Sequence, residues 1–283
     1  MSEFDATFDK GTLYLVATPI GNLGDISRRA CEILEQVEAI ACEDTRRTGK
    51  LLELLGLSTP RLVLANEHRE ALVGATVVEL LEQGQDVALV SDAGTPAISD
   101  PGEQLVSYVI AHGHRVSAVP GPSAVLTALT LSGLSTNRWV MEGFLPRKGK
   151  ERDARLRSLA SDDRTTVIFE SPKRLKKTLV DLAAVCGADR QAAVLRELTK
   201  LYEETVRGTL AELSQRFDAD VKGEIVIVVS SAPLENVSDD AIVSALEAEL
   251  MNGASKSSAV SQVANNLKAA RNRVYSLAHE IRK

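Results

Sequence analysis

Residues 89–102 read LVSDAGTPAISDPG and mark the point where an apolar strand runs into a polar loop. The apolar residues 87–90 predict a buried strand, and Gly94 and Pro96 then force an abrupt change of direction. Ligands of open α/β sheets bind beyond the carboxyl ends of the strands, so this stretch predicts a ligand loop. An ordinary strand-to-helix turn is the alternative. The loop concentrates five polar side chains, namely Ser91, Asp92, Thr95, Ser99 and Asp100.

Two strand-and-loop units of the same kind lie on either side of this stretch. Residues 12–17 (TLYLVA) predict a buried strand that ends in the loop TPIGNLGD, and residues 116–119 predict a strand that ends in PGPSA. Ser123 has the sequence context of a helix N-cap, where free backbone amides can hold the polar end of a ligand. Because strands alternate with helices through residue 134, we expect a parallel sheet flanked by helices.

A further loop, EDTRRTGK at residues 43–50, places paired acids and paired arginines at the end of a strand. Guanidinium groups suit phosphate, so Arg46 and Arg47 are candidates for contact with a nucleic acid. A solvated helix start with its cap is an equally supported alternative. His68, one of four histidines, lies at a helix start and is either a catalytic candidate or a polar cap.

The second half of the chain begins a new alternation of strands and helices. Residues 139–144 predict a strand, and LPRKGKER at 145–152 is a polar, basic crossing. The segment 196–205 is dense in charge for a sheet region, which indicates a cleft. Further strands are predicted at residues 165–170, 192–197, 202–207 and 224–230.

The last part of the chain differs in pattern and charge. Residues 238–283 have a helical pattern throughout, and between residues 254 and 283 six Lys and Arg residues stand against one Glu. Such an excess of positive charge indicates an anionic partner, and three short helices with a basic last one resemble a helix-turn-helix. A solvated helical tail is the alternative. The candidates for RNA contact in this segment are Lys256, Lys268, Arg271 and Arg273.

These patterns predict the domain organisation. We expect α/β domains over residues 1–142 and 153–236, a linker over 143–152 and a helical basic extension over 237–283.

Composition limits the possible classes of protein. With 283 residues, 44% of them hydrophobic, the chain can build two domains of ordinary size, and its net charge of -6 argues against a protein that coats nucleic acid wholesale. No apolar run approaches ~20 residues and no basic, apolar leader is present, so we expect a cytoplasmic protein without a membrane span. Cys31, Cys42 and Cys186 lack metal-ligand spacing, so we expect reduced thiols and no metal.

Eight segments together resemble one known family. They are TPIGNLGDIS, EDTRRTGKLL, SDAGTPAISDPG, PGPSA, GFLPRKGK, FESPKRL, RELTKLYEE and KGEIVIVV. Spread over nearly the whole chain, these segments resemble the ribosomal RNA small subunit methyltransferase I family, which is similar in fold to the tetrapyrrole methylases. One departure lies at residues 66–70, where the chain has His68-Arg69-Glu70 and the family more often has His-Asn-Glu.

The resemblance implies two α/β domains with S-adenosylmethionine (SAM) in the cleft between them. It also implies a homodimer and 2'-O-methylation of a cytidine in the decoding region of 16S rRNA, within the small ribosomal subunit. The basic crossing then adds Arg147 and Lys148 as RNA contacts. The expected SAM contacts are Pro19, Ile20, Gly94, Thr95, Ile98, Ser123 and Ala124 from the first domain, with Phe144, Leu145, Glu197, Leu198, Glu224 and Ile225 from the linker and second domain.

The same chemistry requires help in removing a proton, because a ribose hydroxyl is a weak nucleophile. Glu197 and Lys200 are the first candidates, since a carboxylate accepts a proton and a nearby cation lowers the pKa of a hydroxyl. Asp92 and Glu43 are the next candidates for this role. Strand alternation places Glu197 and Lys200 on opposite faces, with Lys200 reaching the cleft from the turn. The alternative for Lys200 is a surface ion pair with Glu203 or Glu204.

Two other classes of function remain open on the sequence. A tetrapyrrole methyltransferase would share the SAM cleft but would have no use for a basic helical tail. A non-catalytic, ribosome-associated RNA-binding factor would keep the tail but would not need the polar residues in all four loops.

Overall fold

The structure, a computed structural model, describes most of the chain. His68, Asp100 and Lys268 lie outside the described residues, and residues 70–72 are described by their backbone alone. The described ranges are 10–65, 70–99, 102–217, 221–233, 238–267, 269 and 271–281.

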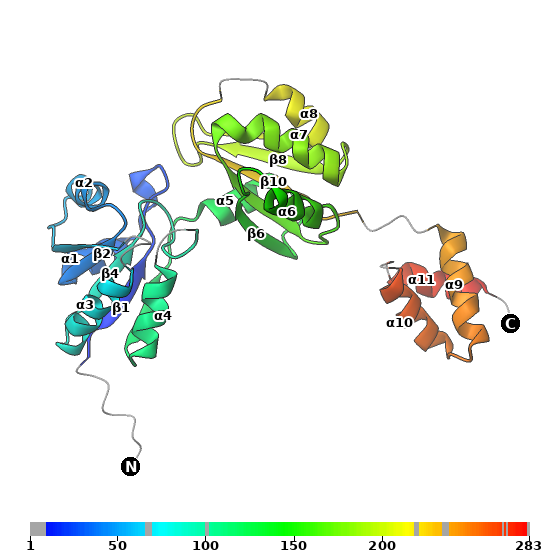
Figure 1. The fold of residues 1–283 in the computed structure, drawn as a ribbon, viewed down its shortest axis with the longest axis horizontal. Helices are drawn as coiled ribbons and strands as arrows, with labels where there is room; N and C mark the ends of the chain where they lie inside the picture. Colours follow the sequence, from blue (N-terminus) through cyan, green and yellow to red (C-terminus); the bar gives the residue numbers. More distant parts are fainter. Residues whose placement is uncertain are drawn as a thin grey trace, which may run out of the picture.

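The first unit is built on a parallel sheet, as the sequence predicts (Figure 1). The strand order is β3-β2-β4-β1-β5, which puts β4 in the centre with β2 and β1 on either side. Because all strands run the same way, their carboxyl ends and the loops that follow lie along one edge of the sheet. The strands are β1 (Thr12–Val16), β2 (Ala39–Cys42), β3 (Arg61–Leu64), β4 (Val87–Val90) and β5 (Arg115–Val119).

Helices cover both faces of this sheet because its strands are apolar on both sides. Ile40 and Ala88 pack with α1 (Arg28–Gln36) and α2 (Thr45–Leu55). Their neighbours in sequence, including Ala41 and Leu89, pack with α3 and α4 on the other face. A short helix η1 (Leu23–Asp25) precedes α1, and the other two helices are α3 (Glu70–Glu82) and α4 (Glu103–Ala111).

The second unit is built on a mixed sheet with the strand order β6-β7-β10-β8-β9. Only the β6 and β7 pair is parallel, and the other three pairs are antiparallel. Helices α6, α7 and α8 supply the leucines that bury one face of the sheet. The elements are β6 (Trp139–Phe144), α6 (Lys150–Ala160), β7 (Thr165–Glu170), η2 (Pro172–Arg174), α7 (Leu175–Cys186), β8 (Gln191–Arg196), β9 (Glu204–Thr209), α8 (Leu210–Arg216) and β10 (Ile225–Val229).

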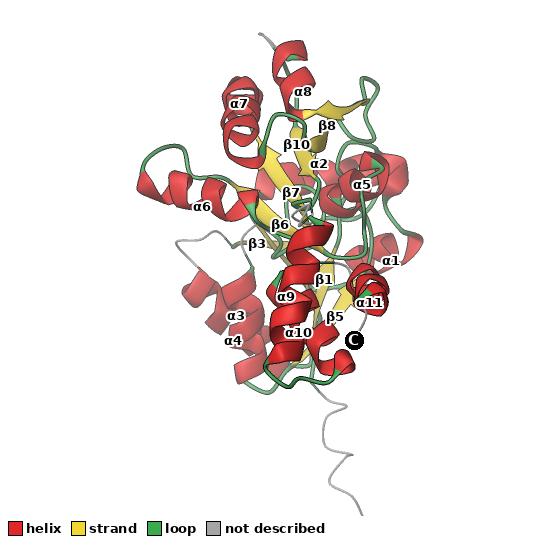
Figure 2. Ribbon diagram, turned by 90° about the vertical axis from the view of Figure 1, so that its right-hand side faces the viewer, coloured by secondary structure: helices red, strands yellow, loops and turns green. Residues whose placement is uncertain are grey.

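Helix α5 (Ala124–Ser132) crosses from the first unit to the second and corrects the expected boundary. It follows β5 in sequence, yet its residues Val125 and Leu129 pack against Val226 and other residues of the second sheet. Figure 2 shows α5 on one side of that sheet and α6 and α7 on the other. Strand β6 pairs with β7, so the boundary at residue 142 falls inside a strand of the second sheet, and the expected linker 143–152 contains the first residues of α6.

The last three helices form a small core of their own. Ile242 and Leu246 of α9 (Asp239–Met251) pack with residues of α10 (Lys256–Asn266) and α11 (Arg271–Glu280), as the helical pattern predicts. Among the described residues, no helix is long and apolar enough to cross a membrane.

Candidate functional site

Hydrogen bonds join the loops that follow β1, β4 and β5. The backbones of Thr18 and Gly94 exchange two hydrogen bonds, of 2.9 and 3.0 Å. The Thr18 hydroxyl also donates to the carbonyl of Ser91 at 3.2 Å, and the Thr95 hydroxyl donates to the carbonyl of Pro122 at 3.2 Å. The three loops that the sequence singles out therefore form one continuous wall at the edge of the first sheet.

Backbone strain concentrates in the loop after β4. Gly94 has a φ of +85°, and a β-carbon placed on it would lie 3.3 Å from Cγ2 of Ile20. Ala97 and Ser99 adopt left-handed φ values of 65° and 61° although neither is glycine. Such conformations persist only where the surrounding structure holds them, and they are common at ligand sites.

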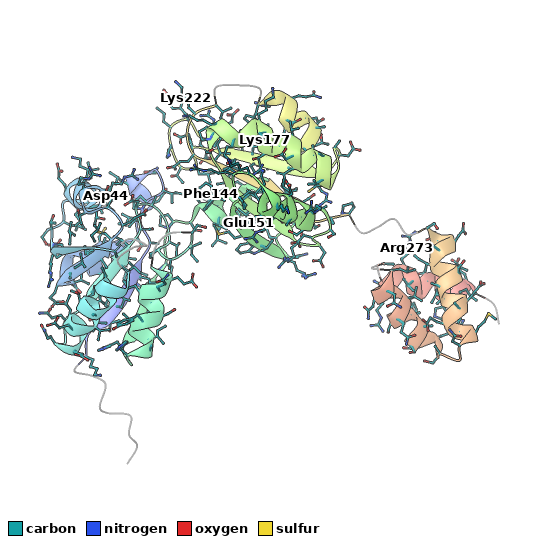
Figure 3. All side chains as sticks on the ribbon, viewed as in Figure 1. Asp44, Phe144, Glu151, Lys177, Lys222 and Arg273 are labelled. Carbon is teal, nitrogen blue, oxygen red and sulfur yellow. The ribbon has the colours of Figure 1, made fainter. Side chains whose placement is uncertain are left out.

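The second unit supplies the facing wall. The rings of Phe144 and Phe169 lie 5.6 Å apart, and Figure 3 shows Phe144 between the two α/β units. Helix α5 adds its N-terminus, where the Ser123 hydroxyl accepts a hydrogen bond from the amide of Leu126, as the predicted N-cap should. The first-turn amides of a helix have no partner inside the helix, which leaves that of Ala124 available to a ligand.

The two walls enclose a pocket of about 370 Å³, within the size range of small-ligand sites. Ten of the expected SAM contacts line it, namely Ile20, Gly94, Thr95, Ile98, Ser123, Ala124, Phe144, Leu198, Glu224 and Ile225. The structure brings these residues together around one space from six separate parts of the sequence, numbered 20, 94–98, 123–124, 144, 198 and 224–225.

Three expected contacts lie beside the pocket and do not line it. Pro19 is half-buried next to Ile20. Leu145, which follows β6 directly, is buried in the core of the second unit, whereas Phe144 is exposed. Glu197 lies behind Glu224, whose backbone amide donates to Oε1 of Glu197 at 2.9 Å.

The pocket also contains residues that we did not select from the sequence. The largest group of them, four consecutive residues, belongs to the end of β7 and the turn after it. The signal was available, since FESPKRL is one of the family segments and begins at the end of a strongly apolar strand. These additional lining residues include Phe169, Glu170, Ser171, Pro172 and Gly223.

Lys200 is held by two carboxylates at the rim of this site. Its Nζ lies 2.9 Å from Oε1 of Glu197 and 2.9 Å from Oε2 of Glu224. The expected strand alternation is wrong beyond Arg196, because Glu197 and Thr199 adopt left-handed φ values of 52° and 65°. The turn therefore brings Glu197 and Lys200 together instead of placing them on opposite faces.

The surface pairing considered for Lys200 is also wrong. Glu203 accepts a hydrogen bond from the backbone amide of Thr199 at 2.6 Å, and Glu204 pairs with Arg196 and Arg216. A side chain as long as lysine can reach partners distant in sequence, and here it pairs with Glu224, the residue before β10.

The charge states follow from these contacts. Burial alone would lower the pKa of Lys200, but its hydrogen bonds to Glu197 and Glu224 raise that pKa above its ordinary value. The hydrogen bond from Lys200, followed by that from the backbone of Glu224, holds the pKa of Glu197 below its ordinary value. At neutral pH the pair is therefore a fixed ammonium and carboxylate, and neither group is poised to take up a proton.

Asp92 occupies a different position, on the side of the β4 loop that faces α2. Its Oδ2 lies 3.0 Å from Nη1 of Arg47, while its Oδ1 is buried and has no hydrogen-bond partner among the described residues. Burial raises the pKa of Asp92, although Arg47 acts in the opposite direction. Asp92 adjoins Ala93, which lines the pocket, whereas Glu43 is half-buried at the end of β2.

The candidates for RNA contact divide into paired and unpaired cations. Arg46 bonds to Asp44, the N-cap of α2, and holds the pKa of Asp44 at about 2. Arg273 pairs with Asp239 at 2.6 Å, and Arg271 donates to the Ser261 hydroxyl. Arg47 pairs with Asp92, and the remaining described candidates, Arg147, Lys148 and Lys256, are exposed.

The fold and the pocket define a protein of two α/β units with one ligand cleft between them, and comparison with known proteins gives the family. The sequence profile of the Tetrapyrrole (Corrin/Porphyrin) Methylases matches residues 12–214. The chain belongs to that family and, within it, to the ribosomal RNA small subunit methyltransferase I group, as the eight segments indicate.

Two curated relatives and one solved structure document this similarity. The ribosomal RNA small subunit methyltransferase I of Synechocystis sp. is 42% identical over 96% of this chain and 98% of its own length. That of Xylella fastidiosa is 49% identical over 78% of this chain and 82% of its own length. A uroporphyrin-III C-methyltransferase from Thermus thermophilus, solved with S-adenosylhomocysteine, has the same fold, with a TM-score of 0.56 and 19% identity over 78% of this chain and 98% of that one.

Proposed function

We propose that the chain transfers a methyl group from SAM to the ribose 2'-hydroxyl of a cytidine in the decoding region of 16S rRNA. The observation that carries the proposal is the pocket between the two units, which brings ten of the thirteen expected SAM contacts around one space. Membership of the ribosomal RNA small subunit methyltransferase I group supports RNA as the acceptor.

The pocket fits a ligand with an apolar base and several polar groups. Phe144 and Phe169 offer aromatic surface for a base, and the amide of Ala124 and the carboxylate of Glu224 offer polar contacts at the walls. Gly94 permits close approach of the backbone, because its positive φ and missing β-carbon leave that space free. When bound there, SAM supplies a methyl group on a sulfonium. The protein orients the acceptor oxygen in line with that methyl and excludes water.

Lys200 acts in this proposal as a positioning residue. Its ammonium is occupied by Glu197 and Glu224, so it neutralises two carboxylates and fixes the wall to which Glu224 belongs. This role differs from the stabilisation of developing negative charge that the sequence indicates, and the two roles make different predictions for SAM affinity.

Asp92 is the proton acceptor that we favour, because it adjoins Ala93 in the pocket wall and its Oδ1 has no hydrogen-bond partner among the described residues. Its pKa is raised by burial, whereas that of Glu197 is lowered by Lys200, and a carboxylate of higher pKa is the stronger base. In the proposed step the Asp92 carboxylate would accept the 2'-hydroxyl proton. The ribose oxygen would bond to the methyl carbon as the bond from that carbon to sulfur breaks, and S-adenosylhomocysteine would be the product that leaves.

The proposal extends to partners and location. The acceptor is 16S rRNA in the small ribosomal subunit, the enzyme is a homodimer, and it works in the cytoplasm where that subunit is made. A two-fold dimer would place the basic helices of one subunit beside the cleft of the other. Light scattering at micromolar concentration should give the mass of two chains, and a monomer would contradict this part of the proposal.

Nucleoside analysis tests the proposed reaction. Small subunits that lack the modification are incubated with the protein and SAM, and the digested RNA is examined by mass spectrometry and by primer extension. We expect 2'-O-methylcytidine at one position of the decoding region. Methylation of a base, or of a nucleotide outside that region, would contradict the proposal.

A further inference from the structure

Two short segments of the second unit are rich in Lys and Arg. Residues 147–150 read RKGK and residues 173–177 read KRLKK, with no acid in either segment. In a chain with a net charge of -6, such segments stand out from the rest of the surface.

The structure ties these two segments together. Arg174 donates from Nη2 to the carbonyl of Leu145 at 2.7 Å, just before the first segment. Arg152 donates to the carbonyl of Pro146 at 3.0 Å and to the hydroxyl of Thr178 at 3.0 Å, just after the second. The loop after β6 is therefore fastened to the start of α7 from both sides, and Figure 2 shows α6 and α7 on the same side of the sheet.

Two kinds of cation occupy this region. Arg152 is 4% exposed and pairs with Asp181, and Arg174 pairs with the fully buried carboxylate of Glu170. The charges of both arginines are therefore used in ion pairs within the protein. Lys177, labelled in Figure 3, is 67% exposed and pairs with Asp181. Within the described parts of the chain, no ion pair involves the exposed cations Arg147, Lys148, Lys150 and Lys173. Arg152 and Arg174 thus fix the backbone, while the lysines and Arg147 are exposed.

Both segments begin next to the pocket. Phe144 and Pro172 line the pocket, and Arg147 and Lys173 follow them by three residues and one residue. At the reach of an extended chain, the Cα of Arg147 lies within about 10 Å of that of Phe144, and the Cα of Lys173 lies within about 4 Å of that of Pro172. An extended anion lying across these cations would therefore pass the rim of the pocket.

We propose that this surface, the cationic platform, holds the phosphate backbone of the RNA strand next to the nucleotide that enters the pocket. The inference rests on the proposed function and adds where the acceptor strand lies. Exposed cations at fixed positions bind a polyanion by releasing its counterions, which gives affinity without base specificity. The platform consists of Arg147, Lys148, Lys150, Lys173, Lys176 and Lys177.

Charge reversal with a matched control tests the platform. The full-length variant Lys148→Glu/Lys173→Glu is compared with Arg28→Glu/Arg157→Glu, which changes net charge equally at exposed arginines on α1 and at the far end of α6. Binding of a labelled decoding-region RNA and of small subunits is measured across KCl concentrations, and SAM binding is measured by calorimetry. Anionic phosphatidylserine vesicles serve as a second probe.

We expect the platform variant to bind RNA at least tenfold more weakly at low salt. The slope of log K against log salt should fall by about 1.4, since each lost contact to a single strand removes about 0.7. SAM affinity should stay within twofold, and the control variant should bind RNA like the wild type.

Three outcomes would overturn the platform: equal losses in both variants, no loss in either, or wild-type binding to the vesicles that exceeds binding to RNA. The proposed function fails by a separate result, namely no methyl transfer by the wild type to small-subunit RNA. The binding titration still tests the platform in that case, because it does not depend on turnover.

Discussion

The side chain of Lys200, from the second unit, lies across the backbone of Gly21, from the first. A β-carbon on Gly21 would stand 2.4 Å from Cγ of Lys200 and 2.9 Å from its Cε. The far end of the same side chain bonds to Glu197 and Glu224 at 2.9 Å each. One lysine therefore couples the first loop of the chain to the pocket wall contributed by the second sheet.

This coupling predicts that Lys200→Met weakens SAM binding about tenfold. Methionine keeps most of the stem, but Glu197 and Glu224 lose the cation between them, so the wall should shift. Calorimetry with SAM measures the effect. An unchanged SAM affinity with a methylation rate at least tenfold lower would instead support a direct role of Lys200 in stabilising negative charge.

A double-mutant cycle tests the contact with Gly21 itself. Gly21→Ala should weaken SAM binding in the wild type, because its methyl group would overlap Lys200. In the Lys200→Ala background the same change should cost less by about 0.5–3 kcal/mol, the usual range for residues in contact. Additive effects of the two substitutions on SAM affinity would contradict the coupling.

Gly94→Val should abolish SAM binding while the protein stays folded. Valine is strained at a φ of +85°, and its β-carbon would lie 3.3 Å from Ile20 in the wall of the pocket. The apolar residues of β4 are untouched, so circular dichroism should report a native fold. Undiminished SAM binding by the folded variant would refute the placement of SAM against this loop.

Asp92→Asn should lower single-turnover methylation about 100-fold or more, the usual contribution of a general base. Because the ionised carboxyl accepts the proton, the wild-type rate should rise with pH through the pKa of Asp92, and burial moves that rise above pH 3.8, the ordinary value. The variant should lose this dependence while its SAM affinity stays within twofold. A normal methylation rate in the variant would contradict Asp92 as the general base. Glu43 would then be the next candidate, tested with Glu43→Gln.

Deletion of residues 238–283 should preserve SAM binding and weaken association with small subunits in a salt-dependent way. The three helices have their own core, and the residues that line the pocket all precede them. Lost phosphate contacts should flatten the salt slope. If the truncated protein methylates subunits as well as the full chain at every salt concentration, these helices are structural.

Strong local signals made most of the fold predictable. Strands 139–144 and 165–170 have the predicted bounds, because their apolar runs end at turn residues, and Ser123 caps α5 as its sequence context indicates. The pocket loops were predictable for the same reason. Gly94 and Pro96 interrupt an apolar strand, and polar side chains follow at once.

The predictions that were wrong concern features that depend on tertiary contacts. The apolar residues of α5, such as Val125 and Leu129, suit either sheet, and only the assembled core shows that they pack on the second. Glu197 and Thr199 carry no signal for a left-handed backbone, since both are ordinary residues in strands and turns. The partners of Lys200 were missed because that turn, and not the strand register, sets its direction.

Methyl transfer from labelled SAM to competing acceptors tests the central claim most directly. The full-length protein is incubated with labelled SAM and either small ribosomal subunits that lack the modification or a porphyrinoid. We predict label in the 16S rRNA of the small subunits and none in the porphyrinoid. Label in the porphyrinoid, or SAM binding without transfer to any RNA, would contradict the account.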